Sequence, residues 1–427
     1  MIEQRYRTDI LVVGAGPAGV AAAFRAAESG ARVLVVDDNP QCGGQIWRAD
    51  SKKALDKDAT KWLDRIRDSS VKFLGGLKVF DRPEPGVMRA EGFDQVVACR
   101  FEKLILATGA RERFLPFPGW TLPNVTGSGG LQALVKAGLP IEGKRIVVAG
   151  SGPLLLAVAG YLKERGAKIQ IIAEQTRRFD LVKLGLRLLK CPKKLQQAFD
   201  LKMKLQGIPY LTNCWPVSAS GRNAVESVTL QQGPKEWAVS CDYLACGFHL
   251  LPNTELAELL GCRIEKGSVW VDEFQETSVQ GLYCVGESCG VGGLELALVE
   301  GEVAGWAATN LKEKARERFS ERRKWRGFAA GLNRAFELRR ELKKLPTPET
   351  FICRCEDVPF SRLQSEHSWR SAKLQTRCGM GPCQGRVCGP ATEFLFGWKT
   401  ESVRPPVFPV RLGSFVPSSA GDAPAES

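Results

Sequence analysis

Apolar and polar positions near the start of the chain follow the pattern of a strand, a helix and a second strand. The run Ile10–Val13 is short, apolar and rich in β-branched residues, which is typical of a strand buried on both faces. The alanine-rich run Val20–Ala27 predicts a helix, Gly30 ends it, and Val33–Val36 predicts the next strand. These positions together predict a βαβ unit.

Three glycines separate the first strand from the helix. Gly14 permits a tight turn, Gly16 lets a pyrophosphate approach the backbone, and Gly19 lets the helix pack closely on the sheet. Asp37 follows eighteen residues after Gly19, where a carboxylate accepts hydrogen bonds from a ribose. Strand, glycines, helix and acid in this register predict a dinucleotide site. Its residues are Gly14, Gly16, Pro17, Ala18, Gly19, Asp37 and Asp38.

A second unit of the same kind begins at Arg145. Its strand leads into Gly150 and Gly152, but Leu155 stands where the third glycine belongs. The residue eighteen positions after Leu155 is Ala173, with Glu174 next to it. The pattern predicts a second Rossmann-like domain whose NAD(P) site is degenerate.

The remaining pattern predicts further strands and helices. Pro116 and Pro118 mark a crossing point between domains. Strands are expected at 71–79, 95–101, 104–107 and 281–285, and helices at 54–68 and 294–308. The chain is rich in Pro, Ser and Ala from Arg404 onward, and its last ten residues are expected to be disordered.

Composition excludes several classes of protein. With 427 residues the chain can form two or three domains, and its polar start and interrupted apolar runs predict neither a signal peptide nor a transmembrane segment. We expect a cytoplasmic protein. Two histidines give little support to zinc hydrolase or Ser-His chemistry, and His249 at a strand end is interpreted as structural. Much of the net charge of +13 lies in Lys312–Lys344, interpreted as a solvated or subunit-facing helix; nucleic acid is not an expected partner.

Fourteen cysteines without an export signal argue against a disulfide framework. Several, such as Cys99, Cys241 and Cys246, lie in apolar runs and are expected to be small buried hydrophobic residues. Five others crowd into a short segment rich in glycine and charge: Cys353, Cys355, Cys378, Cys383 and Cys388. Thiolates paired around such turns suit a [2Fe–2S] cluster, and they also suit zinc.

The two glycine fingerprints, Ala107-Thr108-Gly109 and Val285-Gly286-Glu287 resemble the two-dinucleotide-domain flavoproteins, which include thioredoxin reductase. The resemblance implies FAD in the first domain. It adds Gly44, Gln45, Val79, Thr108, Gly109, Gly286 and Glu287 to the cofactor-binding residues, with Glu287 standing where the family usually has Asp. The redox-active Cys-x-x-Cys of thioredoxin reductase has no counterpart in the second domain, so disulfide reduction is not expected.

The segment from Cys353 to Arg386 resembles the bacterioferritin-associated-ferredoxin type of [2Fe–2S] domain. That resemblance favours iron and sulfide over zinc. The resembling motif is carried by four of the five cysteines, and Cys378 is interpreted as a neighbour that is not a ligand. The implied ligands are Cys353, Cys355, Cys383 and Cys388.

Together with Gly150-Ser-Gly-Pro-Leu-Leu-Leu, Gly247-Phe-His-Leu-Leu-Pro-Asn-Thr and Arg404-Pro-Pro-Val-Phe-Pro-Val, these features resemble the α subunits of opine oxidases, hydroxyproline and proline dehydrogenases, and hydrogen cyanide synthase. The resemblance implies a D-amino-acid-oxidase-like β subunit that oxidises the amine at its own flavin, and a chain without catalytic residues. It further implies an external electron acceptor, an FMN between subunits, membrane association through the complex and a small ferredoxin-like subunit.

The sequence thus predicts an α/β protein with two Rossmann-like domains, the second inserted in the first, and a small helical iron–sulfur domain. The expected parts are an FAD domain (1–115 and 245–315), an NAD(P)-like domain (116–244), a basic helical linker (316–348), a [2Fe–2S] domain (349–402) and a tail (403–427). The favoured function is an electron-transfer subunit of an amino-acid, imino-acid or opine dehydrogenase. The alternatives are a self-contained NAD(P)H-dependent flavin and iron–sulfur reductase, and a scaffold with a degenerate nucleotide site.

Overall fold

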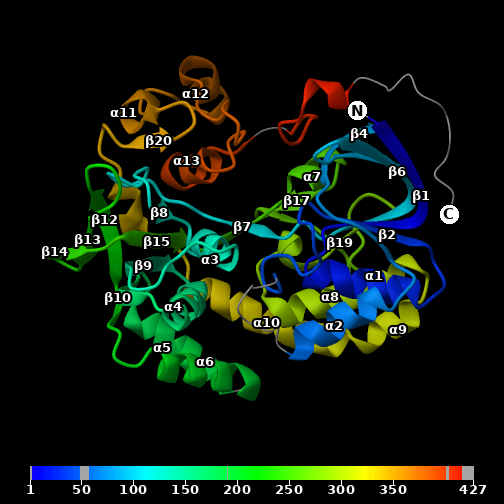
Figure 1. Ribbon diagram of the computed structural model, residues 1–427, viewed down its shortest axis with the longest axis horizontal. Coiled ribbons are helices and arrows are strands. Elements are labelled where there is room, and N and C mark those ends of the chain that lie inside the picture. Colours follow the sequence, from blue (N-terminus) through cyan, green and yellow to red (C-terminus); the bar gives the residue numbers. More distant parts are fainter. Residues whose placement is uncertain (1, 49–56, 190, 401–402, 416–427) are drawn as a thin grey trace. The chain divides into compact units, whose positions relative to one another are not determined.

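The computed structural model describes residues 2–48, 57–189, 191–400 and 403–415 (Figure 1). The chain divides into two compact units. The first comprises residues 1–111, 251–330 and 402–427, and the second comprises residues 112–250 and 331–401. The final ten residues, predicted to be disordered, lie outside the described ranges.

A seven-stranded sheet forms the centre of the first unit. Its strands follow the order β3-β2-β1-β6-β5-β4, and β19 also pairs with β6. The strands β1, β2, β3, β6 and β19 are parallel, whereas β4, β5 and β6 form an antiparallel meander. The bounds are β1 (Ile2–Val13), β2 (Val33–Val36), β3 (Lys72–Leu74), β4 (Lys78–Glu84), β5 (Val87–Glu91), β6 (Gln95–Leu106) and β19 (Leu282–Cys284).

Helices α1 and α8 pack against each other beside this sheet (Figure 1). Small residues let their backbones approach, since a Cβ on Gly301 would lie 2.3 Å from Ala18 O and one on Gly305 would lie 2.4 Å from Ala22 O. The helices of this unit are α1 (Pro17–Ala27), α2 (Lys57–Arg67), α7 (Glu255–Leu259), η1 (Gly286–Cys289), α8 (Leu294–Ala308), α9 (Lys312–Glu317), most of α10 (Phe319–Ala335) and η3 (Leu412–Ser414).

The second unit has a parallel five-stranded sheet in the order β11-β10-β9-β15-β8. A separate antiparallel sheet contains β12, β13 and β14. The strands are β8 (Val125–Thr126), β9 (Arg145–Ser151), β10 (Lys168–Glu174), β11 (Tyr210–Thr212), β12 (Cys214–Ser220), β13 (Ser227–Gln232), β14 (Lys235–Ser240) and β15 (Tyr243–Phe248). The helices around them are α3 (Ser128–Lys136), α4 (Leu154–Glu164), α5 (Arg178–Leu188), α6 (Pro192–Lys204) and η2 (Arg340–Lys344).

The cysteine-rich segment forms a small lobe of the second unit, drawn in orange in Figure 1. Its core contains Ile352, Leu363, Trp369 and three of the cysteines. Its elements are β20 (Phe351–Cys353), β21 (Val358–Pro359), α11 (Phe360–Leu363), α12 (Trp369–Thr376) and α13 (Cys388–Phe396). A mixed sheet and a parallel sheet, each packed with helices, and a small helical C-terminal lobe confirm the predicted α/β fold class.

Several element boundaries differ from the sequence pattern. The polar residues before Ile10 belong to β1, because this strand pairs with β6 from Ile2 onward. The two strands expected at 95–101 and 104–107 are the single strand β6, since its pairing with β1 continues through the polar residues between them. The stretch 71–79 is interrupted at Gly75 and Gly76, where Gly76 has a φ of 71°. None of the described helices combines the length and apolar character that crossing a bilayer requires.

Candidate functional site

The first glycine loop lies between β1 and α1. A Cβ on Gly14, whose φ is 106°, would lie 2.2 Å from Ala107 O, and one on Gly19 would lie 1.8 Å from Gly14 O. These two glycines are therefore required by the fold itself. Gly16 differs, because no described atom lies within 4 Å of the position its Cβ would occupy. The space beside Gly16 is open to a ligand.

Gly16 is also the N-cap of α1. No side chain caps this end of the helix, Pro17 occupies its first turn, and the first turn contains no acidic residue. The partial positive charge of the helix N-terminus is thus not neutralised by a carboxylate of its own helix. This end of α1, next to the open side of Gly16, has the properties of a pyrophosphate site.

Asp37 directly follows β2 and is 8% exposed. Its Oδ2 accepts a hydrogen bond from Ala15 N, and its Oδ1 accepts bonds from the backbone and side-chain nitrogens of Asn39, each at 2.7 Å. Asp37 therefore holds the glycine loop against the end of β2, while Asp38 beside it is exposed. Asn39 was not among the predicted residues.

Two more segments reach the same loop. A Cβ on Gly44 would lie 2.9 Å from Gly16 Cα, and one on Gly286 would lie 2.8 Å from Ala18 Cβ. Glu287, next to Gly286, accepts a bond of 2.9 Å from Gly293 N through Oε1. Its Oε2 is buried and has no hydrogen-bond donor among the described residues. A buried carboxylate oxygen that lacks a donor fits a ligand that brings hydroxyl groups, as the ribityl chain of FAD does.

Burial raises the pKa of the Glu287 carboxyl, although the amides of Gly293 and Gly292 act in the opposite direction. Trp47, in the loop that contains Gly44, is also buried, and its indole nitrogen has no acceptor among the described residues. Both groups are polar atoms that the described chain leaves unpaired next to the glycine loop.

Thr108 and Gly109 form a turn after β6. The Thr108 hydroxyl donates to Asn253 O at 2.9 Å and lies 2.9 Å from Ser288 Oγ, and Asn253 Nδ2 donates to Thr108 O at 2.8 Å. The sequence pointed to the turn but not to Asn253 and Ser288 as its partners. Asn253 belongs to the segment Gly247–Thr254, whose resemblance implies no role for this residue.

The other predicted cofactor residues lie at different depths. Val79 is buried in the core on β4, and the preceding Leu77 donates its N–H to Asp37 O at 2.9 Å. Gln45 is exposed in the loop that contains Gly44. Ala18 is buried in the first turn of α1. The structure thus gathers Gly14, Gly16, Ala18, Gly44 and Gly286 around one loop.

The second glycine loop is built differently. Glu174 ends β10 and is 1% exposed, and its two carboxylate oxygens accept bonds from Gly152 N at 2.8 Å and Thr176 N at 2.9 Å. Burial raises the pKa of this carboxyl more than those amides lower it. Leu155 is buried at the start of α4. The acid next to Ala173 is therefore present in the expected region, but it is directed into the protein.

The chain itself covers the second loop. Ser151 Oγ donates to Phe336 O at 3.2 Å, and Gln175 Nε2 donates to Ser151 Oγ at 3.0 Å and to Glu337 O at 3.2 Å. Arg339 N donates to Gln175 Oε1 at 3.3 Å. The segment 336–339 thus lies on the loop that would receive the cofactor phosphates.

A further carboxylate, which the sequence did not point to, occupies another helix end in this unit. Glu112 accepts bonds from Gly129 N at 3.0 Å and Gly130 N at 3.1 Å at the start of α3, and burial raises its pKa. A Cβ on Gly247 would lie 2.6 Å from its Oε1. In the second unit a side chain of the protein fills the position that an anionic ligand would use.

The five cysteines of the C-terminal lobe converge. The thiols of Cys353, Cys378 and Cys388 lie within 4.8 Å of one another, and all three residues are buried. Cys383 is half-buried and Cys355 is exposed. Cys383 interacts with Cys388 and Cys355, so the group forms a continuous set of sulfur atoms. This arrangement fits a metal centre held by thiolates.

The sulfur atoms also receive backbone hydrogen bonds. Bonds from the thiols of Cys378 and Cys388, followed by the amides of Gly379 and Glu356, lower the pKa of Cys353. Cys388 similarly lowers the pKa of Cys383 to about 5. Position 381 has no room for a side chain, because a Cβ on Gly381 would lie 2.3 Å from Cys355 Cβ. Thiolates with N–H donors around them are the donor set of iron–sulfur and zinc sites.

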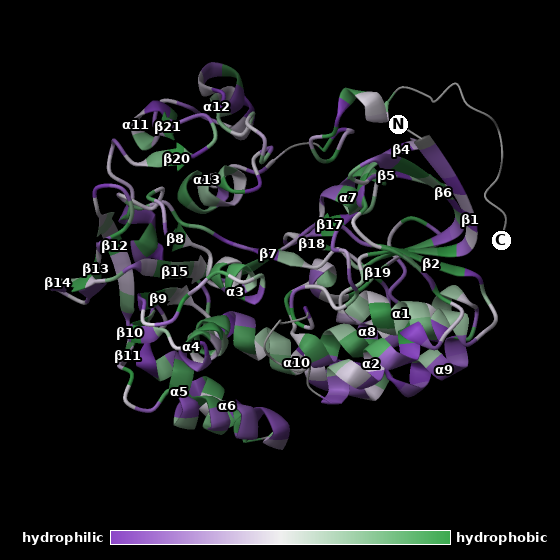
Figure 2. Ribbon diagram, viewed as in Figure 1, coloured by the Kyte–Doolittle hydropathy of each residue, from purple (hydrophilic) through white to green (hydrophobic). Residues whose placement is uncertain are grey.

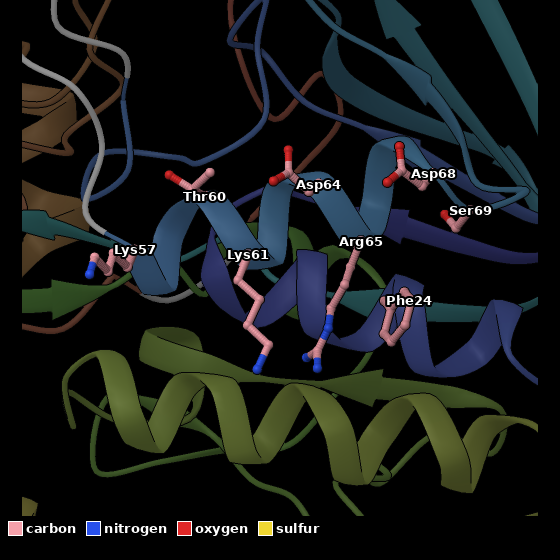
Figure 3. Close-up of a pocket in the computed structure, with 8 residues that line it drawn as sticks. All are labelled: Phe24, Lys57, Thr60, Lys61, Asp64, Arg65, Asp68 and Ser69. Atoms are coloured by element: carbon pink, nitrogen blue, oxygen red, sulfur yellow. The ribbon is translucent and has the colours of Figure 1, made fainter.

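A hollow of about 650 Å³ lies elsewhere, along α2 (Figure 3). Its lining consists mainly of charged and hydroxyl side chains, with Lys61 and Arg65 projecting from a different side of α2 than Asp64 and Asp68. The lining residues are Phe24, Lys57, Thr60, Lys61, Asp64, Arg65, Asp68 and Ser69. No residue of the glycine loops or of the cysteine cluster is among them, so we assign this hollow no function.

Related proteins align with nearly the whole chain. The opine oxidase A subunit of Rhizobium meliloti is 29% identical over 95% of this chain and 86% of its own length. The HcnB subunit of hydrogen cyanide synthase from Pseudomonas protegens is 28% identical over 96% of this chain and 97% of its own length.

Solved structures show the same fold. L-proline dehydrogenase from P. horikoshii matches with a TM-score of 0.69 and 19% identity, over 98% of this chain and 81% of that one. Thioredoxin reductase from T. acidophilum matches with a TM-score of 0.55 and 22% identity, over 73% of this chain and 99% of that one. The family model of the pyridine nucleotide-disulphide oxidoreductases, which indicates FAD binding, matches residues 8–303. The chain is therefore an oxidoreductase that belongs to the pyridine nucleotide-disulphide oxidoreductase family.

Proposed function

We propose that this chain is the flavin- and iron–sulfur-containing electron-transfer subunit of a heteromeric dehydrogenase. The complex would oxidise an amino acid, an imino acid or an opine at the flavin of a partner subunit. The observation that carries the proposal is the presence in one chain of an open dinucleotide loop and of three clustered cysteines, Cys353, Cys378 and Cys388, with Cys383 and Cys355 next to them. Relatives that align over nearly the whole chain are themselves named as subunits.

The first unit would hold FAD. The N-terminus of α1 and the open side of Gly16 suit the pyrophosphate, and Asp37 with Asp38 lies where the adenosine ribose is expected. The buried, unpaired Oε2 of Glu287 suits the ribityl hydroxyls. The further contacts proposed for FAD are Gly14, Pro17, Ala18, Gly19, Gly44, Gln45, Val79, Thr108, Gly109 and Gly286.

The C-terminal lobe would hold a [2Fe–2S] cluster through Cys353, Cys355, Cys383 and Cys388, with Cys378 beside them. Zinc accepts the same donors, and the resemblance to ferredoxin-type domains favours iron. A flavin accepts two electrons and a [2Fe–2S] cluster accepts one, so the two groups together divide a pair of electrons. The chain's own residues bind these groups and supply the N–H donors around the sulfur atoms.

No residue of this chain is assigned to substrate chemistry. The partner would resemble D-amino-acid oxidases, with an FMN at the subunit interface, a small ferredoxin-like subunit in the complex and an external electron acceptor. The predicted division into domains at 1–115 with 245–315, 116–244, 316–348, 349–402 and 403–427 also stays a proposal. A cytoplasmic location is also a proposal, with membrane association only through the complex.

The competing function is an NAD(P)H-dependent reductase. It requires a nicotinamide cofactor on the second glycine loop. The hydrogen bonds from Ser151 and Gln175 to the segment 336–339, together with Leu155 and the inward Glu174, argue against it.

The test is a visible spectrum with flavin and iron analysis of the chain, expressed alone and with the subunit encoded next to it. We expect flavin and about two irons per chain, and bleaching by an amine substrate only when the neighbouring subunit is present. Rapid bleaching by NADH alone would support the reductase instead. Zinc in place of iron would contradict the proposed electron path.

A matched pair of cysteine variants tests the cluster. Cys383→Ser should remove the iron and leave the flavin content unchanged, because the two sites are built from different segments. Cys99→Ser changes a cysteine that is 1% exposed in the core of the first unit, and it should leave the iron content unchanged. Equal iron in both variants would show that Cys383 is not a ligand.

A further inference from the structure

Helices α5 and α6 form a helical hairpin with an unusual surface. Phe179, Val182, Leu186 and Leu189 on or just after α5 are 55–66% exposed. Leu195, Phe199 and Met203 on α6 are 42–61% exposed. These residues are concentrated between positions 179 and 203, and Figure 2 shows apolar and polar positions alternating along both helices.

The exposed residues of each helix share one face. On α5 they recur at spacings of three, four and three, and on α6 they recur at spacings of four. Residues three and four apart are neighbours on a helix surface, so each helix has a continuous apolar stripe. We call the seven residues on these two stripes the hairpin face.

The opposite side of α6 is the one that holds it to the protein. Lys204 forms an ion pair with Glu164, and Lys163 Nζ donates to Lys204 O at 2.7 Å. A Cβ on Gly160 of α4 would lie 3.3 Å from Lys204 and 3.5 Å from Leu201. Because α4 contacts this side, the α6 stripe is directed away from the core. On α5 the buried residue is Leu184, which is not part of the stripe.

Helix α6 has no buried residue along its thirteen positions. Helices of this length are marginal in water without packing of an apolar face. Exposed contiguous apolar patches on a soluble protein mark interaction sites. The hairpin face therefore requires a cover that the described part of this chain does not supply.

The charge of these two helices indicates which kind of surface binds the hairpin face. Nine lysines and arginines and two aspartates lie from Arg177 to Lys204, against a net charge of +13 for the whole chain. Phe and Met within the stripes, with many cations on the same two helices, match the composition of protein interfaces, where aromatic residues and Met are enriched and charges form the rim. The complementary surface is apolar with acidic residues around it.

We propose that the hairpin face is the docking surface for the substrate-oxidising partner subunit, which meets it with an apolar patch ringed by aspartate and glutamate. This inference rests on the proposed function, since that function supplies the partner. A permanent subunit contact also explains how α6 remains helical without any buried residue of its own.

The test is co-purification of the tagged full-length chain with the subunit encoded next to it. The double variant Leu186→Gln with Phe199→Gln should reduce the retained partner at least tenfold and leave the flavin per chain unchanged. The control is Phe93→Gln with Leu412→Gln, two residues of the first unit that are 93% and 86% exposed, and it should retain the partner. Hydrogen exchange in residues 178–204 should slow when the partner is added to the wild-type chain.

A charge variant tests the rim. Lys193→Glu with Lys202→Glu should weaken the complex about tenfold at low salt, and Lys235→Glu with Lys373→Glu, also exposed in the second unit, should not. Failure of the wild-type chain to bind the neighbouring subunit would contradict the proposed function itself. A complex that survives the hairpin substitutions would overturn only this inference. So would a hairpin variant that loses phosphatidylglycerol vesicle binding or self-association while keeping the partner.

Discussion

The two glycine loops of this protein have the same architecture and opposite relations to a ligand. In both, an acid at the end of the second strand accepts a hydrogen bond from the loop, Asp37 from Ala15 and Glu174 from Gly152. In the first loop the side of Gly16 is open, and the first turn of α1 contains no acidic residue. In the second, the segment 336–339 is hydrogen-bonded across the loop.

The difference shows that a dinucleotide fold can keep its framework after its binding surface has been used for internal packing. Glu174 is fully enclosed, and Leu155 fills the space that a third glycine would leave. The covering segment also packs into the second unit, where Leu342 and Leu345 are buried in the core. The second loop therefore contributes to stability, and the first is left for a cofactor.

The sharpest contrast between the two loops comes from one alanine in each. Gly16→Ala should fold normally, because its φ of −70° suits alanine and no atom blocks the Cβ. The methyl group would intrude where a pyrophosphate approaches, so flavin content should fall at least about tenfold, which corresponds to ~1.4 kcal/mol. Gly152→Ala has a φ of 110°, so it should cost ~1–2 kcal/mol of stability with flavin unchanged.

Flavin-to-protein ratios and urea denaturation of both variants measure the two effects. Gly130→Ala is the control, since no atom lies near its Cβ and it stands within α3. Loss of flavin in Gly152→Ala with retention in Gly16→Ala would reverse our assignment of the two loops.

Replacing Glu174, the acid of the second loop, should mainly lower the stability of the protein. Glu174→Ala leaves the N–H groups of Gly152 and Thr176 unpaired in a buried site, so we expect a loss of ~2–4 kcal/mol in the free energy of unfolding. Flavin per folded chain should remain as in the wild type. Asp37→Ala should instead lower both the free energy of unfolding and the flavin content. Denaturation curves and flavin analysis of the two variants distinguish these results.

The pH dependence of Glu174 sharpens the same contrast. Burial raises the pKa of this carboxyl in the folded chain above its value of 4.5 in the unfolded chain. The folded state then binds more protons, so this group's contribution is fully present below pH 4.5 and is lost as pH rises through the folded pKa. Wild type should therefore lose stability relative to Glu174→Gln as pH rises from 4.5 to 7. If the difference in the free energy of unfolding between wild type and Glu174→Gln were the same at every pH, the role of burial would be contradicted.

The smallest effect concerns two surface ion pairs, one in each unit. In the first unit Arg32, just before β2, lies 2.5 Å from Asp9 within β1, and in the second unit Arg145 lies 2.8 Å from Asp242. Hydrogen bonds from these arginines lower the pKa of both aspartates below 3.8. The stabilisation is therefore present above pH 3.8 and is lost as pH falls through the folded pKa values.

Replacing either arginine by alanine should lower the denaturation midpoint only slightly, because exposed pairs contribute little. The loss should shrink in 1 M salt, where charges are screened within about 3 Å. Denaturation midpoints of the two variants at low and high salt measure it. A loss in one unit that is several times larger than in the other would contradict this small, screened contribution.

The sequence determined the local features of this protein. The βαβ units, the roles of Gly14 and Gly19, and the burial of Cys99, Cys241 and Cys246 follow from spacing and side-chain size, and the structure confirms them. These features depend on contacts within one strand–turn–helix unit or on general hydrophobicity. A sequence pattern carries that information directly.

Only the tertiary structure decided the contacts between distant segments. It brings Phe336 to Ser151 across 185 positions, joins Thr108 to Asn253 and Ser288, and groups Cys378 with Cys353 and Cys388. It also leaves the stripes of α5 and α6 exposed, although their spacing alone suits an ordinary buried face. Pairings of this kind depend on how whole elements pack, and no local spacing encodes which surface another segment will cover.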